Sequence, residues 1–155
     1  MNEIVLAKVS AKHADLAYLI GKLDEELLER YPGEEIFGID VEDPKIEEAV
    51  FVVAYHNGKA VGCGGIRPLD HESTELKRFY VDRSVRKQGI AQRILDFVED
   101  AAKELNYSIL KLETGAPQFE AVHFYKKNGF YEIDRFGEYA DCPSSLCFEK
   151  RLPQP

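Results

Sequence analysis

A run of basic side chains around one glycine is the part of this sequence whose residue types could do chemistry. Six basic residues lie between positions 77 and 93 against a single acid, Asp82, in a chain of formal net charge −8. They are Lys77, Arg78, Arg83, Arg86, Lys87 and Arg93. Helical periodicity begins at Gly89, and the free N–H groups and positive dipole end of a helix N-terminus bind anions. The stretch therefore predicts a site for a phosphate-bearing ligand.

Two common phosphate-binding motifs do not fit this stretch. A P-loop needs a glycine followed by Lys and then Ser or Thr, and a dinucleotide fingerprint needs glycines spaced as G-x-G-x-x-G. Residues 86–91 read RKQGIA and match neither pattern. On charge alone, a solvated loop that leads into a helix explains the run as well as a ligand site does.

The elements that must position this stretch follow from hydrophobic periodicity. Strands are predicted over residues 3–9, 49–55, 60–66, 73–82, 108–114, 130–135 and 145–151. Helices are predicted over 10–30, 89–105 and 118–128, the first capped by Ser10 and ended by Tyr31-Pro32-Gly33. Asn57-Gly58 between two apolar runs indicates a tight hairpin. The order β-α, β-β-β, α-β-α-β-β is typical of an α/β sheet of mixed direction, and the acidic segment 33–48 is predicted to form a lid.

Length and composition limit what surrounds the site. With 155 residues and 45% apolar content, the chain can bury one core but is too short for two ordinary domains, so residues 1–155 are predicted to form a single domain. The acidic net charge argues against nucleic acid or an anionic membrane as a partner. Three cysteines without paired spacing argue against disulfides and zinc, as expected in a reducing cytoplasm. Neither a membrane span nor a secretion signal is predicted.

Three stretches carry a resemblance to a known family. Residues 86–91 resemble the R/Q-x-x-G-x-G/A signature of the GNAT N-acetyltransferases, whose backbone amides hold the pyrophosphate of acetyl-coenzyme A. LKLETG (110–115) resembles the fifth strand of that family, and AVHFYKKNGFYEI (121–133) resembles its A-x-x-x-Y-x-x-x-G-F segment. The closing run FGEYADCPSSLCFEKRL (136–152) resembles a bacterial branch with an F-x-x-Y-x-x-x-P-x-S tail that acts on small molecules.

The resemblance implies a fold, a cofactor and a reaction. The fold is a GNAT-type α/β single domain, with a mixed central sheet of about six to seven strands flanked by about four helices. The reaction moves an acetyl group from acetyl-coenzyme A to a primary amine of a small molecule by direct attack, without a metal. The expected cofactor contacts are Phe79, Tyr80, Val81, Arg86, Lys87, Gln88, Gly89, Ile90 and Ala91, with Phe79 and Val81 pairing with the pantetheine arm as an added strand would.

The same resemblance offers two catalytic candidates. Glu75 lies six positions before Val81, the spacing of the glutamate that acts as general base in histone-modifying members, directly or through water. The apolar Phe79 and Val81 are expected to lie beside Glu75 and raise its pKa, although an ion pair with Lys77 explains this residue equally well. Tyr125 stands where the family's tyrosine hydrogen-bonds the thiol sulfur, the alternative being a core tyrosine. The substrate contacts expected are Arg67 and Tyr139.

Two functions remain open at this point. One is an N-acetyltransferase, and the other is a binding or sensing module that keeps the acyl-coenzyme A site but performs no transfer. Glu75 and Tyr125 together favour the enzyme, because a pure binder needs neither. We expect a cytoplasmic protein, and a homodimer is compatible with the sequence.

Overall fold

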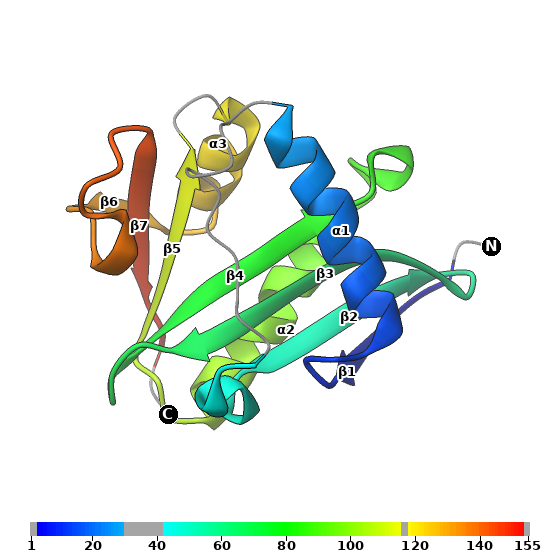
Figure 1. Ribbon diagram of the computed structural model, residues 1–155, viewed down its shortest axis with the longest axis horizontal. Coiled ribbons are helices and arrows are strands. Elements are labelled where there is room, and N and C mark those ends of the chain that lie inside the picture. The colour runs from blue at the N-terminus through cyan, green and yellow to red at the C-terminus, as the bar shows by residue number, and fades with distance from the viewer. Residues whose placement is uncertain (1–2, 30–41, 116–117, 154–155) are drawn as a thin grey trace.

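The computed structural model describes residues 3–29, 42–115 and 118–153, which form one seven-stranded sheet with helices on both faces (Figure 1). The strand order across the sheet is β1-β2-β3-β4-β5-β7-β6. The strands are β1 (Ile4–Val9), β2 (Val50–His56), β3 (Lys59–Pro68), β4 (Ser73–Val81), β5 (Ile109–Gly115), β6 (Tyr131–Ile133) and β7 (Ser145–Arg151). Only β4 and β5 pair in parallel among these strands, so the predicted mixed α/β sheet is confirmed.

Three α-helices lie within the described residues, where about four were expected. They are α1 (Ala14–Leu28), α2 (Ile90–Glu104) and α3 (Phe119–Lys127), with short 3-10 turns η2 (Pro44–Glu48), η3 (Arg83–Val85) and η4 (Gly137–Tyr139). The cap of α1 is His13 rather than Ser10, because the Ser10 carbonyl closes a turn that carries the chain on to His13. Most of the predicted lid over 33–48, and the expected helix stop at 31–33, lie outside the described residues.

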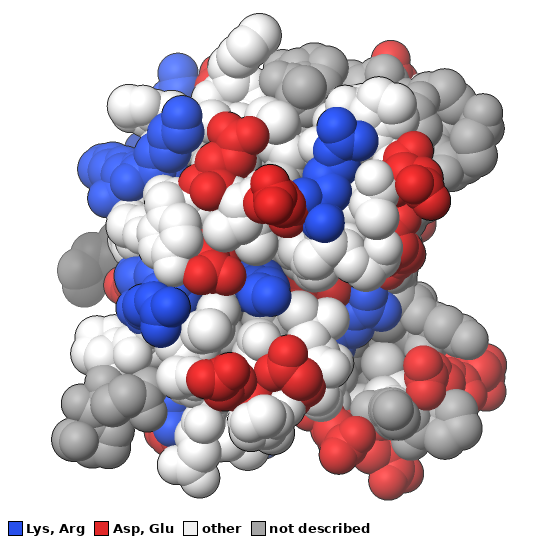
Figure 2. Space-filling model, turned by 90° about the vertical axis from the view of Figure 1, so that its left-hand side faces the viewer, with Lys and Arg blue, Asp and Glu red and all other residues white. Residues whose placement is uncertain are grey.

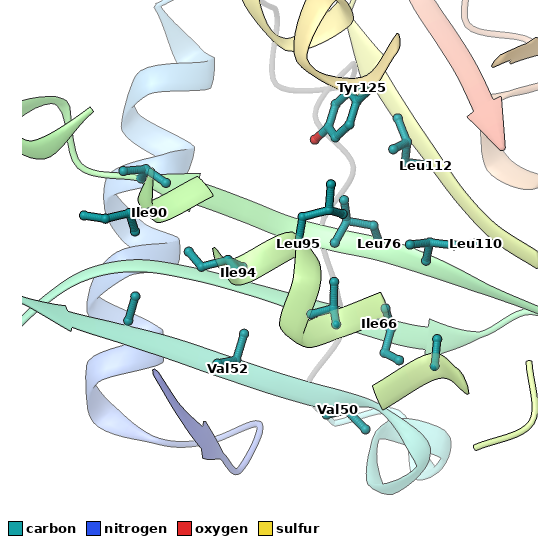
Figure 3. Packing of buried hydrophobic residues seen from close by; sticks show 14 of the residues in the cluster. Val50, Val52, Ile66, Leu76, Ile90, Ile94, Leu95, Leu110, Leu112 and Tyr125 are labelled. Carbon is teal, nitrogen blue, oxygen red and sulfur yellow. The ribbon is translucent and has the colours of Figure 1, made fainter. Parts of the chain in front are cut away.

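Strand alternation divides the core into two layers. On one face, α2 presents Ile90, Ile94, Leu95, Val98 and Ala102 to the sheet residues Val50, Val52, Ile66, Leu76, Leu110 and Leu112 (Figure 3). On the other face, α1 presents Leu16 and Leu19 to Phe51, Val53, Cys63 and Tyr80. This pattern follows from the period of two in strands and of 3.6 in helices. None of the described helices is long and apolar enough to cross a bilayer.

The predicted hairpin is present between β2 and β3. Asn57 and Gly58 have φ values of 51° and 85°, and positive φ at both central residues is the mark of a type I′ turn. The twist of this turn matches the twist of the flanking strands. Asn57-Gly58 therefore sets the pairing of His56 with Lys59 and of Tyr55 with Ala60, after which the register shifts by one residue between Tyr55 and Ala54.

A bulge in β4 changes which residues face which layer. The register runs from Gly65↔Lys77 to Cys63↔Tyr80, so Arg78 and Phe79 together oppose the single residue between them on β3. Arg78 adopts φ 56°, and its carbonyl accepts a hydrogen bond of 3.2 Å from the Cys63 thiol. As a result Phe79 packs in the α2 layer while Tyr80 packs in the α1 layer.

The sheet opens between β4 and β5. These strands pair only at Ser73↔Ile109, Thr74↔Leu110 and Glu75↔Lys111, after which they diverge (Figure 1). Beyond this point β5 continues with β7, and β4 continues with β3. The β5 side of β4 over residues 76–81 therefore has no strand partner among the described residues. Such an edge offers backbone N–H and C=O groups to a ligand.

Gly65 of β3 lies so close to β2 that a methyl group at this position should destabilise the fold. A Cβ there would lie 2.5 Å from the Phe51 ring and 2.9 Å from the Val50 carbonyl oxygen. We expect Gly65→Ala to lower the free energy of unfolding by about 1–3 kcal/mol, measured by urea denaturation. The control is Gly21→Ala within α1, where a Cβ meets nothing within 4 Å and where alanine should stabilise the helix by about 0.5–1 kcal/mol. Equal effects of the two changes would contradict this packing.

Candidate active site

The start of α2 forms an open anion site. Gly89 is the residue before the helix, with φ 81° and no side-chain cap on the first-turn N–H groups. A Cβ at Gly89 would meet nothing within 4 Å, and Lys87, Gln88 and Gly89 are all exposed. The side chain of Ile90 is buried in the core, so this residue offers only its backbone N–H outward. The N-terminus of α2 can therefore receive a phosphate through backbone donors.

Most of the basic run is not free to bind that phosphate. The Arg86 guanidinium donates to the Val81 carbonyl at 2.8 Å and to both carboxylate oxygens of Glu26 at 2.9 Å. Further contacts of the run are Arg78 with Asp24, Arg83 with Glu29, Asp82 with Lys22 and Arg93 with the Ile4 carbonyl. The acidic end of α1 thus offsets the local positive charge counted from the sequence. On the face seen in Figure 2, basic and acidic side chains are likewise interspersed.

Tyr125 brings a hydroxyl toward the opening between β4 and β5. Its ring packs edge-on against Phe79 and Phe130, with centroids 6.2 Å and 5.6 Å away, and its oxygen points away from Leu112 (Figure 3). Burial, and then the charge of Glu113, raise the pKa of Tyr125. No hydrogen bond to this hydroxyl is formed within the part of the chain that the structure describes. Tyr125 is therefore a protonated donor at neutral pH, on the α2 side of the sheet.

Glu75 lies on the opposite, α1 side of the sheet in a polar cluster. Arg67 Nε donates to one Glu75 oxygen at 3.0 Å, and the Tyr139 hydroxyl donates to the other. Lys77 Nζ donates to the Tyr139 oxygen at 2.8 Å, and Arg67 also binds Glu138 at 2.7 Å. The structure thus brings together Glu75, Arg67 and Tyr139, three residues singled out from the sequence, although they come from β4, β3 and η4.

The surroundings of Glu75 differ from those expected. The bulge at Arg78 turns Phe79 and Val81 toward the α2 layer, so neither residue packs beside Glu75. The Glu75 side chain is instead 0% exposed among charged groups, and both of its oxygens accept hydrogen bonds. The ion pair with Lys77, weighed from the sequence, is present at 3.9 Å. The expectation of an apolar environment is therefore wrong.

The bond of Lys77 to Tyr139, and the presence of Glu113 near this cluster, were not found from the sequence. Burial lowers the pKa of Lys77, which hydrogen-bonds Tyr139. Burial raises the pKa of Glu113 in β5, and the Ser145 hydroxyl donates to its carboxylate at 2.5 Å. Alternation in LKLETG gave the only signal, because the apolar Leu110 and Leu112 put Glu113 on the other face of the strand.

The parallel strands β4 and β5 separate, and the helix that connects them, α2, begins directly after Gly89. This arrangement defines the class of fold, and comparison with known proteins gives the family. The chain matches the family model described as "Acetyltransferase (GNAT) family" over residues 18–130. It is 35% identical to the IAA acetyltransferase of Azospirillum brasilense over 154 residues, 98% of this chain and 100% of that protein. The chain therefore belongs to the GNAT family of N-acetyltransferases.

Solved structures agree with this assignment. A Klebsiella pneumoniae protein, titled a putative acyl-CoA N-acyltransferase, superposes with a TM-score of 0.86 at 26% identity, covering 97% of this chain and 98% of that one. A GNAT family acetyltransferase from Elizabethkingia anophelis, solved with acetyl-CoA bound, gives 0.71 at 21% identity, covering 96% and 98%. The second likeness shows a shared fold. The family resemblance carried by residues 86–91 and 121–133 is thereby confirmed.

The open start of α2 predicts a selective effect at Gly89. A valine there would strain the backbone at φ 81° and put a side chain into the space before the helix. We expect Gly89→Val to weaken acetyl-coenzyme A binding sharply in calorimetry. The control is Gly58→Val in the β2–β3 hairpin, which imposes similar strain at φ 85° with equally open surroundings. Both variants should lose stability, and unchanged binding by Gly89→Val would move the phosphate site elsewhere.

Proposed function

We propose that this protein is a single-domain enzyme that transfers the acetyl group of acetyl-coenzyme A to a primary amine of a small molecule, by direct attack on the thioester. The observation that carries the proposal is the unpaired edge of β4, which leads straight to the open N-terminus of α2. Membership of the GNAT family supports the reaction, and the relative named IAA acetyltransferase supports a small acceptor. The Elizabethkingia structure with acetyl-CoA bound supports the cofactor.

Backbone groups hold most of the cofactor in this proposal. The free edge of β4 at Phe79 and Val81 pairs with the amides of the pantetheine arm, as an added strand would. The N–H groups of Gly89, Ile90 and Ala91 receive the pyrophosphate. The neighbouring residues Tyr80, Arg86, Lys87 and Gln88 complete the loop, with the Arg86 guanidinium 5.8 Å from the centre of the Tyr80 ring. Arg86 acts by shaping this loop, since its Nε is bound to Val81 and one of its terminal nitrogens to Glu26.

The acceptor amine enters on the α1 side of the sheet. Three carboxylates, Glu75, Glu113 and Glu138, stand there against the two cations Arg67 and Lys77. An excess of negative charge in a partly buried cluster favours a cationic ammonium group. Arg67 and Tyr139 fix the shape of this pocket, and Glu75, the candidate base from the sequence, lies between them with both oxygens hydrogen-bonded.

A thiol-release screen tests the proposed function. Acetyl-coenzyme A is offered with amino acids, polyamines, aminoglycosides and peptide N-termini, while calorimetry measures cofactor binding. Release of free coenzyme A with a small amine, and recovery of the acetylated amine, is the expected result. Tight binding of acetyl-coenzyme A with no release for any amine would instead support a catalytically silent acyl-coenzyme A sensor.

Tyr125 is proposed to protonate the departing thiolate, and its removal gives a prediction. Tyr125→Phe keeps the ring between Phe79 and Phe130 but removes the donor. We expect acetyl-coenzyme A affinity to hold while turnover falls by about 10²–10⁴-fold, the usual range for a general acid. The control is Tyr131→Phe, which removes an exposed hydroxyl on β6 bonded to Glu149 and should leave turnover unchanged. An unaltered turnover number for Tyr125→Phe would leave Tyr125 as a packing residue.

A further inference from the structure

Glu113 occupies the open side of the split between β4 and β5. Strand pairing to β4 ends at Lys111, and Glu113 lies two residues further along β5, opposite Cys147 of β7. Its carboxylate acts electrostatically on both sides of the sheet. On the α1 side it influences Lys77, and on the α2 side it influences Tyr125. Glu113 therefore lies on the part of β5 that borders the gap in which a thioester along the free edge of β4 would be held.

The three carboxylates of the cluster differ in their freedom to accept a proton. Both Glu75 oxygens accept hydrogen bonds, and its side chain is 0% exposed. Glu138 is 40% exposed and bound to Arg67 at 2.7 Å. Glu113 is partly exposed and accepts a hydrogen bond from Ser145, with no cation in ion-pairing distance among the described residues. Glu113 alone of these three carboxylates is thus half-buried without a cation bound to it among the described residues, and such surroundings favour proton uptake by a carboxylate.

We infer that Glu113 takes the proton from the acceptor ammonium, and that Glu75 positions Arg67 and Tyr139 around the acceptor. This inference rests on the proposed function and goes beyond it by naming the proton acceptor. It separates two roles that the sequence alone would give to Glu75. Glu75 becomes a positioning residue, held between the Arg67 guanidinium and the Tyr139 hydroxyl.

The proposed step balances in protons and electrons. Glu113 removes one proton from the ammonium, and the freed nitrogen lone pair forms a C–N bond to the thioester carbonyl carbon. The C–S bond then breaks, and its electron pair leaves on sulfur as a thiolate. Tyr125 protonates the thiolate, and the second proton lost by nitrogen returns through solvent to the Tyr125 phenolate. Glu113 releases its proton to water, so both groups are restored.

The groups facing Glu113 set its protonation. They are Glu75 and Lys77 from β4, Glu138 from η4, Tyr125 from α3, and Ser145 and Cys147 from β7. Burial raises the pKa of Glu113. The negative charges of Glu75 and Glu138 raise this pKa further, whereas the Ser145 hydrogen bond and the charge of Lys77 lower it. Loss of the Ser145 hydroxyl should therefore move the pKa of Glu113 upward. The basic form would then appear only at higher pH.

Two probe amines of similar size separate a base from a positioning residue. Ethylamine is an ammonium at neutral pH and must lose a proton before attack, whereas trifluoroethylamine is already neutral. We expect Glu113→Gln to reduce turnover of ethylamine by about 10²–10⁴-fold and to reduce turnover of trifluoroethylamine far less. Glu75→Gln should reduce turnover of both amines by similar factors. Glu132→Gln, an exposed carboxylate of β6, is the matched control with no expected effect.

Melting temperature and acetyl-coenzyme A calorimetry establish that each variant is folded and binds the cofactor. If Glu113→Gln fails to fold, Ser145→Ala takes its place, with kcat/KM for ethylamine expected to rise at a higher pH than in the parent. The inference is overturned if Glu113→Gln affects both amines alike, if Glu75→Gln alone shows the selective loss, or if Ser145→Ala leaves the pH profile unmoved. A parent enzyme that acetylates neither probe nor any amine of the screen would instead refute the proposed function.

Discussion

The loss of hydrogen bonding between β4 and β5 beyond Glu75 is the constraint on which the rest of the structure depends. Backbone groups on an open strand edge need a partner, and here no strand among the described residues pairs with residues 76–81, although Arg86 donates to the Val81 carbonyl. The bulge at Arg78 determines which side chains of β4 point to each helix layer next to this edge. Arg78 itself has φ 56°, a conformation that costs a non-glycine residue about 1–2 kcal/mol. The ion pair of Arg78 with Asp24 and the hydrogen bond from Cys63 hold this conformation. Strain maintained in this way is typical of a functional site.

The split also separates the two halves of the proposed chemistry. Tyr125 reaches the opening from the α2 layer, while Glu113 and the Glu75 cluster lie on the α1 side. A thioester held along β4 would therefore meet an amine from one face and release its thiolate toward the other. Direct attack suits this arrangement, because neither the nucleophile nor the leaving group must cross the sheet. The acidic end of α1 contributes to the cofactor site by holding Arg86 in place, and with it the loop before α2.

Much of the fold could be read from the sequence, because it depends on local patterns. Alternation gave the strands, Asn57-Gly58 gave the hairpin, and Gly89 gave the start of α2. The positive charge available at the start of α2 could not be judged from the sequence, because Arg86 is paired with Glu26, which lies 60 positions away in the chain. The bulge at Arg78 could not be foreseen either, and it reverses the faces on which the neighbours of Glu75 lie. Glu113 was missed because periodicity gives the face of a residue but not its partners.

Amide hydrogen exchange of β4 tests the central claim most directly. Addition of coenzyme A should slow exchange over residues 76–81 and at the start of α2. It should leave the amides of Ser73, Thr74 and Glu75 unchanged, because β5 already pairs with that part of β4. Such a result would show that the ligand completes the strand edge that β5 leaves open. Protection confined to other strands, with residues 76–81 exchanging as before, would contradict the account.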